Sequence, residues 1–585
     1  MRLLMFLAER PGQIVGVADL LDGVWAKAVV TPHSVYEAVA ALRQALGDSS
    51  DRPEYIATLP RRGYRLIAPV TPPPPLSEPP VSEAIPAVDS ASPTQSTSAL
   101  RRRRIPWVWL GAALGLAAIL TMAWFVRTST RGAISADKSI AVLPFVDLSE
   151  KKDQEYLADG LAEELLDVLA NLPRLRVIGR TSSFQFKNRN IDVRSIGAQL
   201  GAAYVVEGSV RRVETRVRVA AQLIRASDGT HQWSGSFDRQ VDDILQVESE
   251  LAAALGRALQ LSVASYGASN GIETHDAEAN DHYLQGLHAL DTHSRARTEE
   301  AADQFQAAIA LDPQFAAAHV SLAMTYYVQA AFGFEPPDAR FPLMREEALK
   351  ALQLNPQSAV AHALLARMAT LYSWDWPEAK REAATALRLG PQNSFALYAS
   401  ADLASILGDF DRSEQLFRAS LVSDPLNPET YCMLATAMQG DELKAAEAEV
   451  RRCLTIAPTY ASGHALLAYF LMLEDRGNEA LDECRLETES GSPICLALVY
   501  HAVGREKESE AALEQAIRAR PATSSYSIAG VFAYRAQNEL SFEWLDRAYH
   551  EKDPSLAYIK GDPSFESLRR DPRYSALLQK MNLPL

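Results

Sequence analysis

The apolar segment at residues 105–126, IPWVWLGAALGLAAILTMAWFV, constrains the architecture of this chain more than any other stretch. Its 22 residues include no charged side chain. As a helix it measures about 33 Å at about 1.5 Å per residue, which matches a hydrocarbon core of about 30 Å. Trp107, Trp109 and Trp124 lie near its ends, where indole rings favour the level of the lipid head groups. We therefore predict a single transmembrane helix.

The charges beside this segment predict its orientation. Arg101–Arg104 precede it, whereas only Arg127 and Arg131 follow it closely. Because basic residues are retained on the cytoplasmic side, we expect a bacterial inner-membrane protein with a cytoplasmic N-terminus and periplasmic C-terminal domains. A cleaved signal peptide would be shorter and N-terminal, and a buried helix of a soluble domain fits these flanking charges poorly.

The acidity of the chain lies after this segment. Of the net charge of −15, residues 1–70 contribute 8 basic and 7 acidic side chains, and residues 137–585 contribute 44 and 63. This balance argues against a nucleic-acid role for the second part. The cysteines there are compatible with periplasmic disulfides and equally with buried thiols. They are Cys432, Cys453, Cys484 and Cys495.

Residues 1–70 predict helices followed by a hairpin. Thr31 is a favourable N-cap, and Pro32 at the first helical position begins a helix that ends near Leu46. Strands at residues 55–59 and 64–67 then flank the basic turn Pro60-Arg61-Arg62-Gly63. A winged helix has this order, with one helix in the major groove and the wing at phosphates or the minor groove.

The run VVTPHSVYEAVAALRQALGDSSDRPEYIATLPRRGYRLIAPV resembles the C-terminal half of the OmpR/PhoB-type DNA-binding domain. Within it, ALRQALGD and YIATLPRRGYRL are characteristic of that family. The resemblance implies promoter DNA as a partner. For Glu37 a solvated face is an equal alternative, and for His33 a cap-region role is favoured. The implied DNA-binding residues are Thr31, His33, Ser34, Glu37 and Arg43 on the helix, and Arg61, Arg62 and Arg65 on the wing.

Two departures from that family pattern weaken the implied DNA binding. The family has an N-terminal antiparallel sheet before its first helix, whereas this chain starts inside that helix. We expect either an upstream start or a winged helix truncated at its N-terminus. The family often has arginines near Ala40 and Ala41, so fewer phosphate contacts are implied here.

Residues 71–100 predict a spacer, because eight prolines and six serines without Lys or Arg cannot form a packed core. Fully extended, it would reach on the order of 90 Å. A Pro-rich ligand for a partner domain is the alternative. Within the apolar segment, Gly111 and Gly115 form a GxxxG pattern that allows close helix packing and hence a homodimer.

Residues 137–260 predict an α/β domain, with apolar strands at 139–145 and 204–210 and helices at 154–172, 193–200 and 241–259. The runs SIAVLPFVDLS, DGLAEELLDVLANLPRLRVIGR and YVVEGSVRR resemble a domain found before TPR arrays in bacterial membrane regulators. They are also similar to the N-terminal domain of the periplasmic TolB protein. This resemblance implies a sensor or docking module without catalytic residues. We interpret Asp159, Glu163 and Glu164 as a solvated acidic helix face.

Residues 277–585 predict an all-α repeat array. Prolines at 313, 356, 391, 425 and 458 are 43, 35, 34 and 33 residues apart, and the longest interval contains an insertion at 333–337. The period resembles that of tetratricopeptide (TPR) units, about 34 residues. A stacked array offers a long concave surface, so we expect a protein or peptide ligand on the TPR surface.

Histidines and tyrosines recur within these repeats. His319, His362 and His464 occupy one repeat position, and residues one or more repeats apart are too distant to share a metal ion. We therefore expect scaffold or inner-surface roles for them and no metal site. Tyrosines 326, 327 and 431 are candidate ligand contacts, although core packing is favoured for each.

The sequence thus predicts a multidomain chain made of a truncated winged helix, a single transmembrane helix, an α/β domain and a TPR superhelix. Such an order is that of a ToxR-type membrane-integrated transcriptional regulator. With no receiver domain expected, the signal would pass through the membrane helix, for example as a change in dimerisation. The alternative is a periplasmic TPR interaction scaffold with a degenerate DNA-binding domain. We expect no enzymatic activity and no cofactor.

Overall fold

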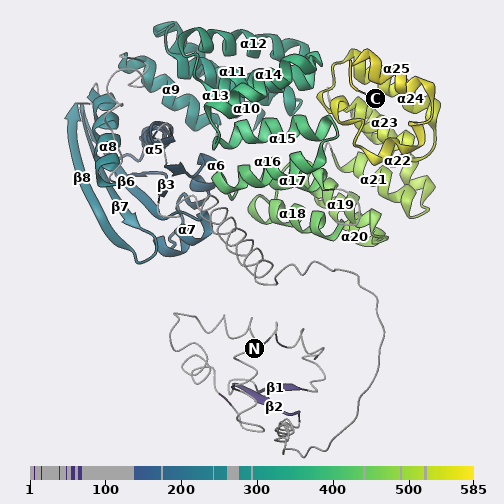
Figure 1. The fold of residues 1–585 in the computed structure, drawn as a ribbon, viewed down its shortest axis with the longest axis horizontal. Helices are drawn as coiled ribbons and strands as arrows, with labels where there is room; N and C mark the ends of the chain where they lie inside the picture. Colours follow the sequence, from purple (N-terminus) through teal and green to yellow (C-terminus); the bar gives the residue numbers. More distant parts are fainter. Residues whose placement is uncertain are drawn as a thin grey trace, which may run out of the picture. The chain divides into compact units, whose positions relative to one another are not determined.

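The computed structural model forms two compact units, residues 1–111 and 112–585 (Figure 1). In the first unit it describes residues 55–59, 63–68 and five isolated positions, Phe6, Val15, Val39, Leu42 and Asp48. In the second unit it describes residues 138–585 except 171, 173–174, 241–242, 260–273, 275, 291–293, 439–442, 488–490, 520–523 and 585.

Several predictions from the sequence fall outside these ranges. They are the helix that begins at Thr31, the spacer at 71–100 and the apolar segment at 105–126. Among the described residues, no helix combines the length and apolarity needed to cross a bilayer. The transmembrane helix therefore stays a prediction.

A two-stranded hairpin is the described core of the first unit. Strand β1 (Ile56–Leu59) pairs antiparallel with β2 (Gly63–Leu66), with Ile56 opposite Leu66 and Leu59 opposite Gly63. The hairpin expected from the alternating sequence is confirmed.

The second unit begins with a mixed six-stranded sheet in the order β5-β3-β6-β7-β8, with β4 beside β6. β3 lies parallel to β5 and β6, β4 is parallel to β6, and β6, β7 and β8 are antiparallel. The strands are β3 (Ser139–Val142), β4 (Val146–Asp147), β5 (Arg176–Val177), β6 (Tyr204–Val213), β7 (Arg216–Arg225) and β8 (Thr230–Gln240). The helices are α5 (Glu155–Ala170), α6 (Arg180–Ser183), η1 (Phe184–Phe186), α7 (Val193–Leu200) and α8 (Ile244–Ala258).

Helices cover the two faces of this sheet unequally. On one face Val206, Val217 and Val219 pack into the cluster that includes side chains of α5 and α8. On the other face, among the described residues, Ala141 and Val205 pack with residues of α7 and η1 near β3. The predicted strand at 139–145 ends as β3 at Val142, since Pro144 has no N–H to continue the ladder, and β4 follows at Val146–Asp147.

The rest of the second unit is a curved array of helix pairs (Figure 1). The first four pairs are α9 (Ala277–Leu290) with α10 (Arg295–Leu311), α11 (Ala316–Ala331) with α12 (Pro337–Leu354), α13 (Ala359–Met368) with α14 (Trp376–Leu389), and α15 (Ser394–Ile406) with α16 (Phe410–Ser423). A π-helical segment, η3 (Ala369–Ser373), extends α13. The next four pairs are α17 (Pro428–Ala437) with α18 (Leu443–Ile456), α19 (Gly463–Leu473) with α20 (Gly477–Leu486), α21 (Ser492–Ala502) with α22 (Glu506–Ala519), and α23 (Ser525–Tyr534) with α24 (Asn538–His550).

The boundaries between pairs follow the predicted repeat ends. A polar side chain caps the first helix of several pairs soon after the repeat proline. Asn393 Oδ1 accepts from the Ala396 N–H at 2.9 Å, and Asn427 Oδ1 accepts from the Thr430 N–H at 3.1 Å. Such caps satisfy helix donors that have no partner within the helix.

The last residues depart from the predicted repeat. Three Asp-Pro pairs at positions 553, 562 and 571 begin η5 (Pro554–Tyr558), η6 (Pro563–Leu568) and α25 (Pro572–Lys580). Each aspartate accepts from the backbone N–H two residues later, at 2.8–3.1 Å. Leu556, Phe565 and Tyr574, three residues after each aspartate, are buried. We call residues 553–583 the C-terminal clasp.

The clasp returns the chain to the third and fourth helix pairs. Trp376 Nε1 donates to the Met581 carbonyl at 3.0 Å, and the Tyr558 hydroxyl donates to the Asp402 carboxylate at 3.0 Å. Asp402 also pairs with the Arg367 guanidinium, and both side chains are buried. Arg367 Nε donates to the Tyr327 hydroxyl at 3.1 Å. One polar cluster therefore joins α11, α13, α15 and η5.

We expect Asp402→Ala to lower the free energy of unfolding by about 3–5 kcal/mol, because it leaves the buried Arg367 charge without its partner. Denaturant unfolding of the purified full chain, followed by tryptophan fluorescence, measures this. The matched control is Asp482→Ala, which breaks a pair with Arg485 (2.6 Å) at a side chain that is 73% exposed. That change should cost less than about 1 kcal/mol. Equal effects of the two substitutions would contradict the assigned role of Asp402.

Candidate nucleic-acid interface and surfaces of the second unit

The hairpin of the first unit presents one basic side chain from a fixed backbone. Tyr64 and Leu66 are buried, so the intervening Arg65 points to the opposite face of β2. Val15 and Tyr64 exchange two backbone hydrogen bonds, of 2.8 and 2.9 Å. This bridge holds β2, and hence the Cα of Arg65, next to Val15.

Arg65 is suited to binding an anion. Its side chain is partly buried, and its Nε is itself buried and lacks a hydrogen-bond partner among the described atoms. A guanidinium with unused donors binds phosphate oxygens with charge-assisted hydrogen bonds. The other predicted DNA-binding and helix-packing residues lie outside the described ranges and stay predictions. They are Thr31, His33, Ser34, Glu37, Arg43, Arg61, Arg62, Gly111 and Gly115.

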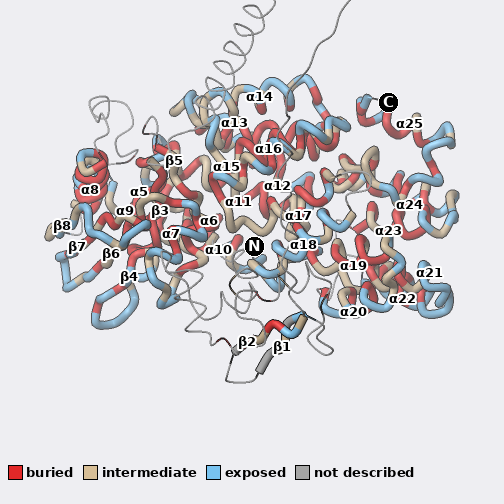
Figure 2. Tube along the Cα trace, turned by 60° about the horizontal axis from the view of Figure 1, so that its bottom comes forward, coloured by how far each residue is buried: buried red, intermediate tan, exposed pale blue. Residues whose placement is uncertain are grey.

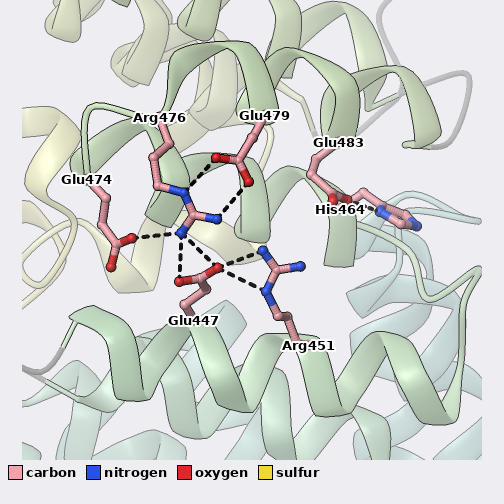
Figure 3. A network of polar contacts seen from close by, with 7 residues as sticks. All are labelled: Glu447, Arg451, His464, Glu474, Arg476, Glu479 and Glu483. Carbon is pink, nitrogen blue, oxygen red and sulfur yellow. Dashed lines mark hydrogen bonds and ion pairs between the residues drawn. The ribbon is translucent and has the colours of Figure 1, made fainter. Parts of the chain in front are cut away.

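The three recurring histidines each face a glutamate on the other helix of the pair. His319 Nδ1 lies 2.5 Å from Glu347 Oε2. The corresponding distances are 2.6 Å for His362–Glu382 and 2.7 Å for His464–Glu483 (Figure 3). Burial raises the pKa of Glu347, but hydrogen bonds from His319 and Lys350 outweigh it and leave that pKa below its usual value. The histidines therefore join the helices of a pair, and the described residues contain no group arranged to hold a metal.

The prediction that α5 presents a solvated acidic face is wrong at Asp159. Asp159 is buried and pairs with Lys187, and its Oδ2 lies 3.0 Å from His288 Nδ1. Glu163 is paired with Arg180 at 2.6 Å. The sequence pattern suggested one buried face, whereas α5 packs against the sheet, α8 and α9 and buries more than one.

Part of the predicted ligand surface is covered by the chain itself. Tyr326 and Tyr327 are buried, which confirms the core packing favoured for them. Arg367 lies over the rings of Tyr327 and Tyr398, at 5.4 and 5.3 Å from their centroids. Because the clasp inserts Tyr558 at this cluster, the inner side of α11, α13 and α15 is occupied there.

The structure pairs all four cysteines, a choice that the sequence left open. Cys432 on α17 is bonded to Cys453 on α18, with Cα atoms 5.8 Å apart. Cys484 on α20 is bonded to Cys495 on α21, with Cα atoms 5.5 Å apart. Both separations are typical of disulfides. The bridges join helices within the fifth pair and between the sixth and seventh pairs.

An arginine adds a polar connection to the same arc of the array (Figure 3). Arg476, at the start of α20, donates to Glu447 on α18 at 3.0 Å and to Glu474 at 2.9 Å. Its Nη2 donates to Glu479 at 2.7 Å. Arg451 shares the Glu447 carboxylate. The fifth and sixth pairs are therefore tied by a charge network as well as by packing.

Contacts at two separate places join the α/β part to the array. Asp424, after α16, accepts from the Ser182 backbone N–H at 2.9 Å, and the Gly179 N–H donates to the Ser423 carbonyl at 2.7 Å. Burial raises the pKa of Asp424. At the other contact the Tyr156 hydroxyl donates to Asp281 on α9 at 2.7 Å. With contacts at both α9 and α16, the sheet and the array are held at two separated places.

Comparisons with known proteins identify the two ends of the chain. Residues 1–66 match the family "Transcriptional regulatory protein, C terminal", and residues 496–523 match the tetratricopeptide repeat. The chain thus carries an OmpR/PhoB-type DNA-binding domain at its N-terminus and TPR repeats towards its C-terminus.

Curated relatives include transcriptional activators. The chain is 27% identical over 290 residues to "Transcriptional activator CadC" of Escherichia coli K12. The matched region covers 44% of this chain and 54% of CadC. It is 42% identical over 69 residues to "Cholera toxin transcriptional activator" of Vibrio cholerae, over 12% and 24% of the two chains. It is also 34% identical over 238 residues to "Putative adenylate cyclase 3" of Rhizobium meliloti, over 40% of each. The chain therefore spans 40% and 54% of the length of the cyclase-named relative and of CadC.

Solved structures that match parts of this chain include the following two. Pseudomonas aeruginosa pilF is matched with a TM-score of 0.29 at 18% identity, over 35% of this chain and 92% of that one. Yeast Tom70 is matched with a TM-score of 0.33 at 17% identity, over 52% and 68%.

The clasp makes stability depend on pH through Asp553. Burial raises the pKa of Asp553 to about 6 from an ordinary value of 3.8. The folded chain thus retains this proton where the unfolded chain releases it, so the stabilisation is complete below 3.8 and is lost as the pH rises to about 6. We expect Asp553→Asn to reduce the fall in Tm between these pH values, as measured by scanning fluorimetry of the full chain.

Asp571→Asn is the matched control within the clasp. Hydrogen bonds from Arg573 lower the pKa of Asp571, so its contribution is present above 3.8 and is lost on acidification. This substitution should therefore leave the fall in Tm between pH 4 and 6 unchanged. If Asp553→Asn also left it unchanged, Asp553 would not be the group that titrates there.

Proposed function

We propose that this protein is a membrane-anchored one-component transcriptional regulator. It binds promoter DNA through a cytoplasmic winged helix and senses a periplasmic signal or protein partner through the α/β part and the TPR array. The observation that carries the proposal is the hairpin with Arg65 on its outer face, inside the segment that matches a DNA-binding family.

The wing supplies cations for the DNA backbone. Arg61 and Arg62 stand in the sequence between the two described strands, and Arg65 follows on β2. Phosphate contacts dominate the affinity of such a domain and make it salt-dependent. Thr31, His33, Ser34, Glu37 and Arg43 are the proposed contacts of the helix, where base edges are read.

The apolar segment at 105–126 is the proposed single-pass anchor in the bilayer. Two disulfides in the second unit support a periplasmic location of that unit, because disulfides persist in oxidising compartments and are rare in the cytosol. The Pro-rich spacer at 71–100 would give the winged helix its reach towards DNA.

The signal would pass from the second unit to the DNA through proximity of two copies. A partner bound to the array would also move the sheet, because the two are joined at α9 and at α16. Gly111 and Gly115 would let two membrane helices pack closely in a homodimer. Two winged helices held together gain affinity through their effective concentration.

Named relatives favour this role over catalysis. Two of the three relatives described above are named as transcriptional activators. The cyclase name belongs to a relative that shares 40% of its length with this chain, and we do not propose cyclase activity. A periplasmic interaction scaffold is the second candidate, favoured by the TPR repeats.

Genome-wide DNA occupancy of the full-length membrane-bound protein tests the regulator. We expect discrete peaks that Arg61→Ala/Arg62→Ala/Arg65→Ala removes. In vitro, the slope of log K against log salt should fall by about one for each phosphate-binding arginine that is replaced. The matched control, Arg452→Ala/Arg485→Ala/Arg518→Ala on the array, removes three exposed cations and should keep the peaks. Correct membrane insertion without any peak would favour the scaffold.

Thiol alkylation in cells tests the proposed topology. With a periplasmic second unit, the four cysteines should resist alkylation in the unfolded, unreduced protein and react after reduction. Deletion of residues 105–126 is the control, since retention in the cytoplasm should leave four free thiols. Free thiols in the intact protein would contradict a periplasmic location.

A further inference from the structure

Among the described residues, no helix packs on one face of the sheet in the second unit over most of its length. The strand registers place its outward residues in rows that cross β4, β6, β7 and β8. α7 packs with this face near β3, and α5 and α8 lie on the opposite face. Figure 2 shows exposed residues along β8, and the exposed residues of β6 and β7 lie towards the turn that joins these two strands. The three rows are Val146, Ser209, Ala220 and Ser236; then Leu148, Arg211, Arg218 and Asp238; then Val213, Arg216 and Gln240. We call these residues the open sheet face.

Aliphatic side chains lie exposed along one side of the open sheet face. Val146, Leu148 and Val213 are 54%, 51% and 56% exposed. The cause is the intervening Asp147, whose buried carboxylate accepts from the backbone N–H groups of Ser149 at 2.8 Å and Gln154 at 2.9 Å. Because Asp147 must turn inward to bind this loop, its two neighbours must turn outward. Grouped exposed aliphatics of this kind mark interaction surfaces.

Arginines occupy the middle of the open sheet face. The side chains of Arg216 and Arg218 are 58% and 61% exposed, and both pair with the single carboxylate of Asp238, at 2.5 and 2.7 Å. Arg211, opposite Arg218 on β6, is also exposed. Three guanidiniums against one carboxylate leave this region positive, in a part of the chain that carries 44 basic and 63 acidic side chains.

We propose that the open sheet face rests on the phospholipid surface from which the second unit emerges. Val146, Leu148 and Val213 would enter the head-group layer, and the arginines would bind lipid phosphates. The inference rests on the proposed anchor at 105–126. Between that segment and β3 the chain has residues 127–138, which span at most about 43 Å. The bilayer is therefore the surface that the sheet meets at the highest effective concentration.

The affinity expected from three arginines suits a contact made by a tethered domain. Each basic residue near an anionic bilayer strengthens binding by about fivefold, which is too little for three of them to recruit a free protein firmly. A short tether to the membrane removes most of the entropic cost of association. The same contact is then strong enough to orient the second unit on the bilayer. The acidic array is repelled by anionic lipid, which leaves the open sheet face as the favoured side.

A spin label on Val213→Cys in the full-length chain tests this contact. The native cysteines are all paired, so the new thiol is labelled selectively. In nanodiscs that contain phosphatidylglycerol, we expect about threefold lower accessibility to a water-soluble nickel complex than in detergent. Arg211→Glu/Arg216→Glu/Arg218→Glu should abolish this protection. The matched control, Arg452→Glu/Arg485→Glu/Arg518→Glu, makes the same charge change on exposed array residues and should retain it.

The outcomes separate this inference from the proposed anchor. Co-elution with nanodiscs reports insertion independently, so failure to insert would overturn the anchor and the inference together. Insertion with an equally accessible label in lipid and detergent would overturn the inference alone. Protection in detergent that grows with protein concentration would assign the open sheet face to a second copy, and would also overturn it.

Discussion

A guanidinium inside a protein is stable only when its charge and its donors are matched, and the Arg367 cluster meets this condition with residues from distant parts of the chain. Asp402 supplies the opposite charge, Tyr327 accepts from the guanidinium, and Tyr558 binds the same carboxylate. Helix pairs in an open array contact only their neighbours. Here the last turns instead touch the third and fourth pairs, so the array is closed by contacts that no local signal encodes.

The closed array and the sheet act mechanically as one piece. Asp424 receives the backbone of Ser182, and Tyr156 reaches Asp281, so the sheet is fixed to both the first and the fourth helix pair. The arc between the fourth and eighth pairs has a small core of its own and is reinforced by two disulfides and by Arg476. A ligand that binds the array is therefore expected to reorient the array and the sheet together.

Local signals made much of this fold predictable. The helix at 193–200, the hairpin around Arg61 and Arg62, and the repeat ends at 391 and 425 follow from periodicity, turns and caps, and each is found. The prediction that failed, the exposed acidic face of α5, depends on residues far apart in the chain. Asp159 is buried because α9, more than a hundred residues later, covers α5. The state of the cysteines was open, because the sequence is compatible with disulfides and equally with buried thiols. Most of the candidate DNA-binding residues lie outside the described ranges, so the sequence alone still supports them.

Closure by the clasp also limits how such a protein can evolve. Repeat arrays usually lengthen or shorten by whole units, because each unit needs only its neighbours. In this chain Tyr558 must meet Asp402 and Met581 must meet Trp376, across the intervening helix pairs. A duplication or loss of a pair between them would break both contacts. The number of units in that part of the array is thus fixed by geometry.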